Sequence, residues 1–269
     1  MSETVTGFRA LTANLGRCSR GTGTAERAIG WLADPWLRDY ELLFLQECPD
    51  LELLASAFEV VVAETGPTYR CRSAVAVRRD SGLVATAIPL RTADYHGSYV
   101  AAAKIEGLLS EPVTCLSVHA SPTALTAADR ASWERIESLP AAREGGGPDA
   151  NTLWDADLVH ETLAGLKPRV LAAGDWNEAR AWDDLHPGQT WGLEFFERMK
   201  EAGLVDVPHR DWEGERVTRE PYQLDHVFAS SDIAKRVHSP EVVYSPERIP
   251  ADHKPIEFFI GGQRASEAH

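Results

Sequence analysis

Between residues 59 and 121 the sequence repeats one pattern, a short β-branched or alternating apolar run closed by Gly, Pro or Asp. Runs of this length with a period of two are typical of β-strands. So many short strands in succession predict at least one antiparallel sheet. The runs are EVVVAE (59–64), SAVAVRR (73–79), LVATAIPL (83–90), SYVAAAKIE (98–106) and VTCLSVHAS (113–121).

Helical patterns and further strand-like runs alternate over the rest of the chain. Thr24 is placed to cap a helix that Pro35 ends, and Gly203 stands just past the end of another. These signals predict both ends of the first helix and the end of the second. Helices are expected over 24–33, around 50–58, and over 126–139, 154–166 and 192–203, and further strands over 8–16, 41–47, 169–175, 222–230 and 253–261.

The strands are too numerous for one open sheet, which favours two sheets packed face to face. Helices would then cover the outer faces, because each sheet must bury both of its apolar sides. The expected fold class is α/β, with two mixed β-sheets flanked by helices in a four-layer sandwich. We expect residues 1–269 to form a single domain, since no repeat or linker divides them, and residues 143–151 (REGGGPDAN) to be a loop.

Charge and composition narrow the classes of partner. A formal charge of −14 repels polyanions, so adhesion to nucleic acid or to an anionic membrane through the whole molecular surface is not expected. No apolar span of membrane length and no secretory leader pattern occurs, which favours a cytoplasmic protein without stable membrane association. The four cysteines lack metal-site spacing and are expected to be reduced, buried thiols.

The stretch LAAGDWNEAR (171–180) starts as a buried strand and then turns polar. Side chains alternate along a strand, so Asp175 and Asn177 can project to one side while Trp176 turns to the other. Gly174 leaves room for another backbone to approach closely. The end of this strand therefore presents a carboxylate and an amide together.

Other apolar strands also carry a polar side chain near one end. Each such residue alone is more often a turn residue, or for a histidine a hydrogen-bonded structural group. Taken together they crowd carboxylates that repel one another unless a cation neutralises them, which favours a hard divalent ion such as Mg²⁺. The additional residues are Asn14, Glu47, His119 and Asp225, with Asp252 and His253 just before the terminal strand.

Six short segments in this order resemble the motifs of the endonuclease/exonuclease/phosphatase family, which includes deoxyribonuclease I, abasic-site endonucleases and inositol polyphosphate phosphatases. The resemblance spans residues 8 to 260 and implies a sandwich of two sheets, in agreement with the strand pattern. Two positions depart from the family, because His226 and Trp176 stand where relatives have other aromatic residues. The segments are TANLG, LQE, SVHAS, GDWN, LDHVFAS and ADHKPI.

The resemblance implies a metal cofactor, Mg²⁺ with Mn²⁺ as the alternative. Glu47 would be its principal ligand, with Asn14 beside it and Asp252 bound directly or through water. Indirect contacts are expected because Mg²⁺ usually retains several of its waters.

The resemblance also implies the catalytic roles. Asp175 and Asn177 would address the reacting phosphate and its attacking water, and His119 would donate to a phosphate oxygen. Asp225 would orient His253, as a carboxylate orients the histidine of a hydrolase triad. Whether Asp175 or His253 accepts the proton of the water stays open.

Four tryptophans near expected loops have two interpretations. They could form a stacking surface for a base or an apolar part of a substrate, or they could be buried under the loops, which is the commoner outcome. The four are Trp176, Trp182, Trp191 and Trp212.

The sequence thus predicts a Mg²⁺-dependent phosphoester hydrolase. The preferred substrate is a phosphodiester in nucleic acid (DNA or RNA) or in a nucleotide, cleaved by in-line attack of water. The alternative is a phosphatase or phosphodiesterase for a small-molecule or lipid-headgroup phosphate, which suits the acidic surface. A catalytically inactive binding protein is disfavoured because every expected polar position is filled. No protein partner is inferred.

Overall fold

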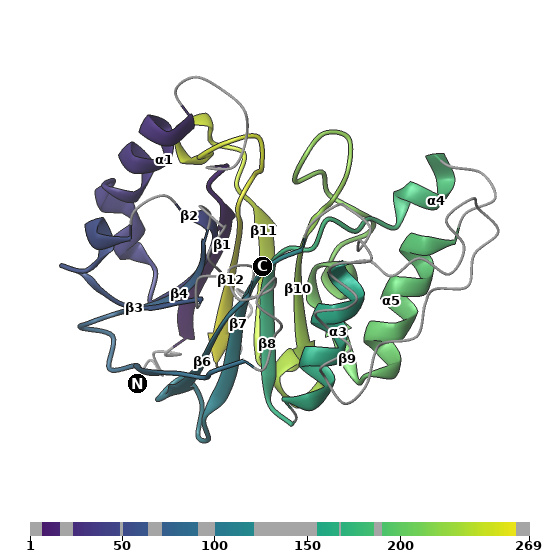
Figure 1. Ribbon diagram of the computed structural model, residues 1–269, viewed down its shortest axis with the longest axis horizontal. Helices are drawn as coiled ribbons and strands as arrows, with labels where there is room; N and C mark the ends of the chain where they lie inside the picture. Colours follow the sequence, from purple (N-terminus) through teal and green to yellow (C-terminus); the bar gives the residue numbers. More distant parts are fainter. Residues whose placement is uncertain are drawn as a thin grey trace, which may run out of the picture.

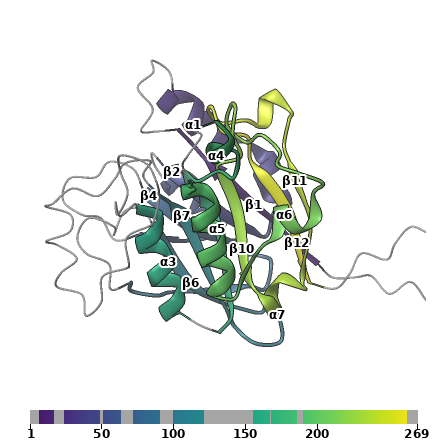
Figure 2. The same ribbon diagram turned by 90° about the vertical axis from the view of Figure 1, so that its right-hand side faces the viewer.

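The computed structural model describes residues 7–16, 24–48, 51–63, 72–90, 100–120, 155–166, 168–185 and 190–261. Within these ranges the strands form two six-stranded sheets that face each other, with helices on the outer sides (Figure 1). Figure 2 shows the helix-bearing side of the second sheet. This arrangement confirms the predicted fold class.

The first sheet combines strands from both ends of the chain. β1 pairs in parallel with β2 and antiparallel with β12, so the N-terminal and C-terminal strands lie side by side. Every other pairing in this sheet is antiparallel. In spatial order its strands are β11 (Val237–Val242), β12 (Ile256–Gly261), β1 (Gly7–Asn14), β2 (Leu42–Cys48), β4 (Arg72–Arg78) and β3 (Phe58–Val62).

The second sheet has the same mixed character. β7 and β8 are parallel neighbours at its centre, and the pairings on either side of them are antiparallel. Both sheets therefore place one parallel pair at the middle. In spatial order the strands are β5 (Val84–Ala87), β6 (Val100–Glu106), β7 (Val113–His119), β8 (Val170–Asp175), β10 (Asp225–Ser230) and β9 (Leu204–Asp206).

Most helices are short and lie outside the sheets or at their ends. α1 covers the outer face of the first sheet, and α3 and α5 cover that of the second (Figures 1 and 2). The α-helices are α1 (Thr24–Leu32), α3 (Asp155–Gly165), α4 (Ala181–Leu185), α5 (Trp191–Glu201), α6 (Val207–Asp211) and α7 (Ser231–Ala234), and the 3₁₀ turns are η1 (Pro35–Asp39), η2 (Glu52–Leu54) and η3 (Pro246–Arg248).

Alternation along the central strands divides the apolar side chains between layers. In β2, Leu42 and Phe44 enter the core between the sheets, whereas Leu43 and Leu45 pack under α1. The second sheet does the same, with alternate residues of β8 facing the first sheet or the helices. A strand buried on both faces reads as a continuous apolar run, as LLFL does.

Polar side chains also join the two sheets inside this core. Gln46 Nε2 of β2 donates to Ser117 Oγ of β7 over 2.8 Å, and Ser117 Oγ donates in turn to the carbonyl of Leu45 over 2.8 Å. All three residues are fully buried. Because a buried polar group costs free energy unless it is paired, these bonds favour one alignment of the sheets.

One predicted element is wrong and two others are not described. The helix expected around residues 50–58 is a single turn, because Phe58 already begins β3 and no side chain caps the start of η2. The helix expected over 126–139 and the loop expected over 143–151 lie outside the described residues.

Two further expectations concern membrane and redox context. None of the helices that the structure describes is long and apolar enough to span a bilayer. Cys48 and Cys115 are buried free thiols, and burial raises the pKa of both well above the usual value. Thiols of raised pKa are poor nucleophiles, so these two cysteines belong to the core rather than to redox chemistry.

Candidate active site

The strands that carry the predicted site residues end at the same edge of the sandwich. Asn14 and Glu47 stand at the ends of the parallel pair β1 and β2. His119 and Asp175 end the parallel pair β7 and β8 and are paired in register. Asp225 begins the antiparallel strand β10 directly opposite Asp175. Strand register therefore brings these side chains to one edge of the two sheets.

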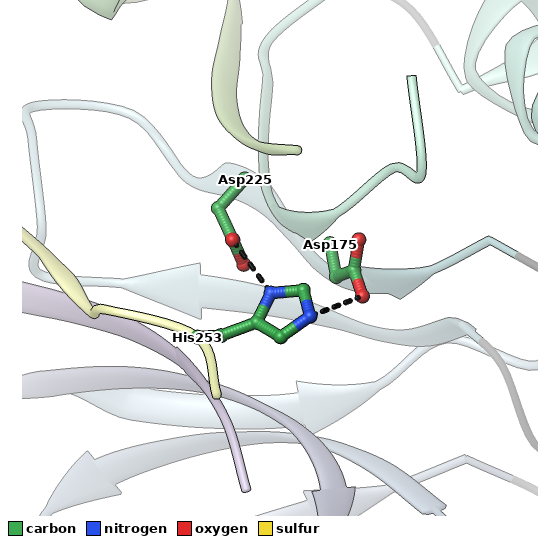
Figure 3. Close-up of side chains that lie close together, drawn as sticks. All are labelled: Asp175, Asp225 and His253. Atoms are coloured by element: carbon green, nitrogen blue, oxygen red, sulfur yellow. Dashed lines mark hydrogen bonds and ion pairs between the residues drawn. The ribbon is translucent and has the colours of Figure 1, made fainter. Parts of the chain in front are cut away.

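Three side chains form the centre of this site (Figure 3). His253 Nδ1 lies 2.8 Å from Asp225 Oδ2, and its Nε2 lies 3.6 Å from Asp175 Oδ2. The histidine comes from the segment before β12 in the first sheet, whereas both carboxylates come from the second sheet. All three residues are buried. The imidazole thus spans the gap between the sheets.

A second bridge between the sheets runs through Asn14. Its Nδ2 donates to Glu47 Oε1 over 3.2 Å and to Asp175 Oδ2 over 2.9 Å. His119 Nε2 lies 3.4 Å from Glu47 Oε1 and 3.8 Å from Asp175 Oδ2. The carboxylates of Glu47 and Asp175 therefore share two polar neighbours, so the structure brings the two acids to the same place.

Backbone strain occurs at two of these positions. Glu47 and Asn177 have φ of 50° and 49°, in the left-handed region that non-glycine residues rarely adopt. A register irregularity between Leu45 and Cys48 accompanies the first of these, where β2 pairs with β4. Such conformations cost on the order of 1 kcal/mol each and persist only where surrounding structure holds them. Their position at the strand ends supports a functional role for this edge.

Asn177 is held by the two strands beside it. Its backbone N–H donates to Asp175 Oδ1 over 3.0 Å, and its Nδ2 donates to the carbonyl of Ala120 over 2.6 Å. The side-chain amide thereby ties the turn after β8 to the residue after β7. Asn tolerates a positive φ better than most residues, which explains the residue type at this turn.

Asp252 is placed differently from the other predicted residues. Its carboxylate Oδ2 accepts from Arg219 Nε over 3.0 Å, and both side chains are about half exposed. Burial would raise the pKa of Asp252, but the hydrogen bond from Arg219 holds it below the usual value. The structure thus engages this predicted metal ligand in an ion pair at the rim, whereas the other seven predicted residues join in one network.

Electrostatics at the centre favour a charged histidine. Burial alone would lower the pKa of His253, but the charges of Asp225 and Asp175 and the bond to Asp225 raise it to about 10. Burial raises the pKa of Asp175, and the nearby charges of His253 and His119 oppose that rise. His253 therefore serves as an imidazolium donor between two acids at neutral pH.

The charged histidine predicts a pH dependence of stability for the metal-free protein. The pKa of His253 is about 10 in the folded state against 6.5 ordinarily. A raised pKa stabilises the folded state fully below pH 6.5, and that contribution is lost as pH rises to about 10. We expect the unfolding free energy in EDTA to fall over this window by on the order of 3 kcal/mol more in the wild type than in His253→Gln.

Urea denaturation at intervals of one pH unit measures this difference. His209→Gln, which changes an exposed histidine of α6, is the matched control and should keep the slope of the wild type. Equal slopes for the wild type and His253→Gln would contradict the ion-pair assignment.

Two overlapping groups of side chains in the site could hold a cation. Ligand atoms of Asp175, Asp225 and His253 lie within 4.8 Å of one another. The imidazole of His253 already donates to Asp225, so in this form it is a poor ligand. The oxygens of Glu47 and Asp175 are the better match to Mg²⁺, which prefers carboxylate ligands. Their shared neighbour Asn14 uses its amide oxygen to accept from the N–H of Gly16 and would have to turn over to bind a metal through it.

A buried ion-pair network supports the turn that carries Asn177. His226 is fully buried, with Nδ1 3.4 Å from Asp206 Oδ2 and Nε2 3.0 Å from the carbonyl of Glu178. Arg180 Nη2 lies 3.2 Å from the same Asp206 oxygen. Burial would raise the pKa of Asp206 and lower that of His226, but their mutual attraction reverses both directions.

This network is a set of residues that the motifs alone do not reveal. His226 stands where the resemblance would place a different aromatic residue. The structure shows it stacked on Phe228 with a ring separation of 5.7 Å and also paired with Asp206. Asp206 lies 20 residues earlier in the chain, so no spacing rule would have paired the two.

The tryptophans divide between the two interpretations. Trp176 is fully buried against Phe228, and Trp212 is buried with its Nε1 donating to the carbonyl of Pro240. Trp182 is half-buried and meets Tyr222 edge to face with ring centroids 5.9 Å apart. The side chain of Trp191 lies outside the described residues. Among the described side chains of these tryptophans, Trp182 is the one that is not buried.

Comparison with solved structures identifies the fold. The endonuclease domain of TRAS1, a telomere-specific non-LTR retrotransposon, is 19% identical with a TM-score of 0.63 and covers 96% of this chain and 100% of its own. An AP endonuclease from Leishmania major is 15% identical with a TM-score of 0.60 and covers 98% and 90%. An endonuclease/exonuclease/phosphatase family protein from Bacteroides thetaiotaomicron is 16% identical with a TM-score of 0.59 and covers 100% and 99%.

These likenesses establish a fold in common rather than a close relationship. No protein-family model matches the chain, and no curated protein sequence matches it. The fold nonetheless agrees with the two-sheet sandwich that the six motifs predict. The resemblance is therefore confirmed at the level of the fold.

Proposed function

We propose that the chain is a divalent-metal-dependent phosphoesterase of the endonuclease/exonuclease/phosphatase family. One observation carries the proposal: carboxylate, amide and imidazole groups from both sheets meet in one buried network around Asp175. Burying several charged groups together is costly, so such a network is a strong candidate for catalysis. The solved structures of like fold that are named as endonucleases support the same reaction class.

The proposed reaction is in-line displacement by water at a phosphorus atom. His253, held protonated by Asp225, would donate to a phosphate oxygen as negative charge gathers there. His119 and Asn177 flank the same carboxylate and would add further donors. Asp175 would then be the acceptor that orients or deprotonates the attacking water.

The proposed cofactor is Mg²⁺, with Mn²⁺ as the alternative. Glu47 would be the principal protein ligand, Asp175 lies within reach of the same region, and Asn14 would join after its amide turns over. When bound, the ion supplies positive charge that neutralises the two carboxylates and polarises the phosphoester. Asp252 lies outside this set and would bind the ion either directly, after its ion pair with Arg219 breaks, or through a water.

The preferred substrate is a phosphodiester in DNA, RNA or a nucleotide. Trp182 and Tyr222 are partly exposed aromatic residues of the kind that can stack with bases. The formal charge of −14 favours the alternative, a phosphatase or phosphodiesterase for a small molecule or a lipid headgroup. The two differ in how activity depends on salt.

Hydrolysis assays with and without metal test the proposal. Plasmid DNA, single-stranded oligonucleotides and a panel of phosphomonoesters are incubated with Mg²⁺, with Mn²⁺ and with EDTA. We expect activity with either metal, a loss of at least roughly 100-fold in EDTA, and recovery when Mg²⁺ is returned. A steep fall in the rate of polymer cleavage as the salt concentration rises would support nucleic acid as the substrate, because a protein that contacts the phosphate backbone releases counterions when it binds. Full activity in EDTA would contradict the metal-dependent mechanism.

The proposal also covers the domain organisation, the cellular location and the partners of the protein. A single domain over residues 1–269 and a cytoplasmic location stay predictions, the latter supported by the buried free thiols. We propose no stable membrane association and no protein partner. The phosphoester substrate is the partner that the candidate active site would bind.

A further inference from the structure

A cavity lies at the opposite end of the sandwich from the candidate active site. Its volume is about 880 Å³, within the range of small-molecule sites. Arg169, on the cavity wall, directly precedes β8 and Asp175 ends it, so the two lie roughly 20 Å apart along the strand. This basal cavity is lined by Phe8, Gly107–Ser110, Arg169, Asp232, Lys235, Arg236, His238 and Gly261.

The basal cavity gathers positive charge on an acidic protein. Arg169 Nη1 is balanced by Asp232 at 3.0 Å and by Glu111 at 3.6 Å. Lys235 and Arg236 are exposed, and among the described residues no ion pair or side-chain hydrogen bond is found for either. Two cations thus remain to attract an anion where the formal charge of the whole chain is −14.

Arg210 leaves these two cations available. The last carbonyls of a helix attract positive side chains, and α7 ends immediately before Lys235. Arg210 already donates to the carbonyls of Ala234 and Val237, over 2.5 and 2.8 Å. The end of α7 is therefore neutralised by a different arginine, and Lys235 and Arg236 are not needed to cap it.

Two wall residues of the cavity also have unsatisfied polar atoms. Arg169 Nε and His238 Nε2 are buried and have no hydrogen-bond partner in the described structure. Buried polar nitrogens are nearly always paired, by protein, water or ligand. Both atoms belong to residues that line the cavity, although neither atom is itself exposed to solvent.

The remaining wall is apolar. Leu108 is buried, and Phe8 and Leu109 pack from the cavity side against the core between the sheets. A cavity with an apolar wall and a cationic wall matches a molecule with a flat or apolar part and an anionic part. Inorganic phosphate alone would use only the second of these walls.

We propose that the basal cavity binds an organic phosphate of nucleotide size, with the phosphate at Lys235 and Arg236 and the apolar part against Phe8 and Leu108. This site is separate from the proposed reaction, because its residues lie at the other ends of the strands. A ligand there would stabilise the folded protein in proportion to its affinity.

Calorimetric titration with adenosine 5′-monophosphate in EDTA and low salt tests the proposal. We expect one binding site, with adenosine and inorganic phosphate each binding more weakly than the nucleotide. The double variant Lys235→Glu/Arg236→Glu should weaken binding at least roughly tenfold, because it replaces attraction by repulsion. Both side chains are exposed, so the variant should keep the melting temperature of the wild type within a few degrees.

Two further variants make the result decisive. Arg27→Glu/Lys200→Glu carries the same charge change at exposed helix positions elsewhere and should leave nucleotide binding unchanged. His253→Gln in the candidate active site should also leave it unchanged. The proposal is overturned if the nucleotide does not bind, if binding survives the Lys235/Arg236 exchange, or if His253→Gln removes it. None of these outcomes depends on whether the protein hydrolyses phosphoesters.

Discussion

Replacing Asp175 by Asn is expected to lower kcat for phosphoester hydrolysis by roughly 10³-fold or more. The carboxylate accepts from Asn14 at one oxygen and from the backbone N–H of Asn177 at the other. An amide has the same size but a single oxygen, so it satisfies only one of these donors. It also cannot take a proton from water at neutral pH.

Single-turnover hydrolysis with saturating Mg²⁺ measures this effect. Asp184→Asn makes the same chemical change at an exposed position of α4 and should retain wild-type kcat. Because the exchange leaves a buried donor unpaired, the variant should melt below the wild type, so hydrolysis is measured at a temperature at which both proteins are fully folded, which separates lost chemistry from lost folding. Unchanged hydrolysis in the Asn variant would contradict the proposed mechanism.

Replacing Gly174 by Ala is expected to destabilise the fold by more than roughly 3 kcal/mol. A Cβ at this position would lie 1.9 Å from the carbonyl oxygen of Val118, which is backbone rather than a movable side chain. The residue pairs with Val118 in the parallel ladder of β7 and β8, so neither strand can withdraw without losing the register. The same ladder aligns His119 with Asp175.

Urea denaturation and soluble yield measure the effect of this substitution. Gly30→Ala is the matched control, because a Cβ at this helix position meets nothing within 4 Å. Alanine is the better helix former, so this control should be as stable as the wild type or more stable by about 0.5 to 1 kcal/mol. A Gly174→Ala protein with wild-type stability would show that the two strands can separate without penalty.

The long apolar runs could be predicted from the sequence, whereas the three-residue strand β9 and the interrupted edge strand β11 could not. β2 and β8 read as continuous apolar strands because both of their faces are buried. β9 has only three residues, too few for a periodic signal. β11 contains Pro240 and an irregular register, which an edge strand tolerates and a sequence pattern does not reveal.

The candidate site could be predicted in its membership but not in all of its contacts. Strand ends with polar residues predict convergence, and seven of the eight named residues do meet in one network. Asp252 turns to Arg219, 33 residues away, which local spacing cannot indicate. Local spacing cannot indicate the Asp206–His226 pair either, because that pair forms only when β9 lies against β10. The catalytic and metal-binding roles of all eight stay proposals.

The cross-sheet bonds of Gln46 and Ser117 lie just inside the edge where Asn14 and His253 join one half of the sandwich to the other. Since neither half holds a complete set of reactive groups, a slip of one half along the other by even an ångström would misalign those groups before any apolar surface reached water. The catalytic rate would then respond to a change in the relative position of the two sheets before any spectroscopic signal of unfolding did. Substitutions deep in the interior, far from any substrate, should therefore be screened by rate as well as by melting.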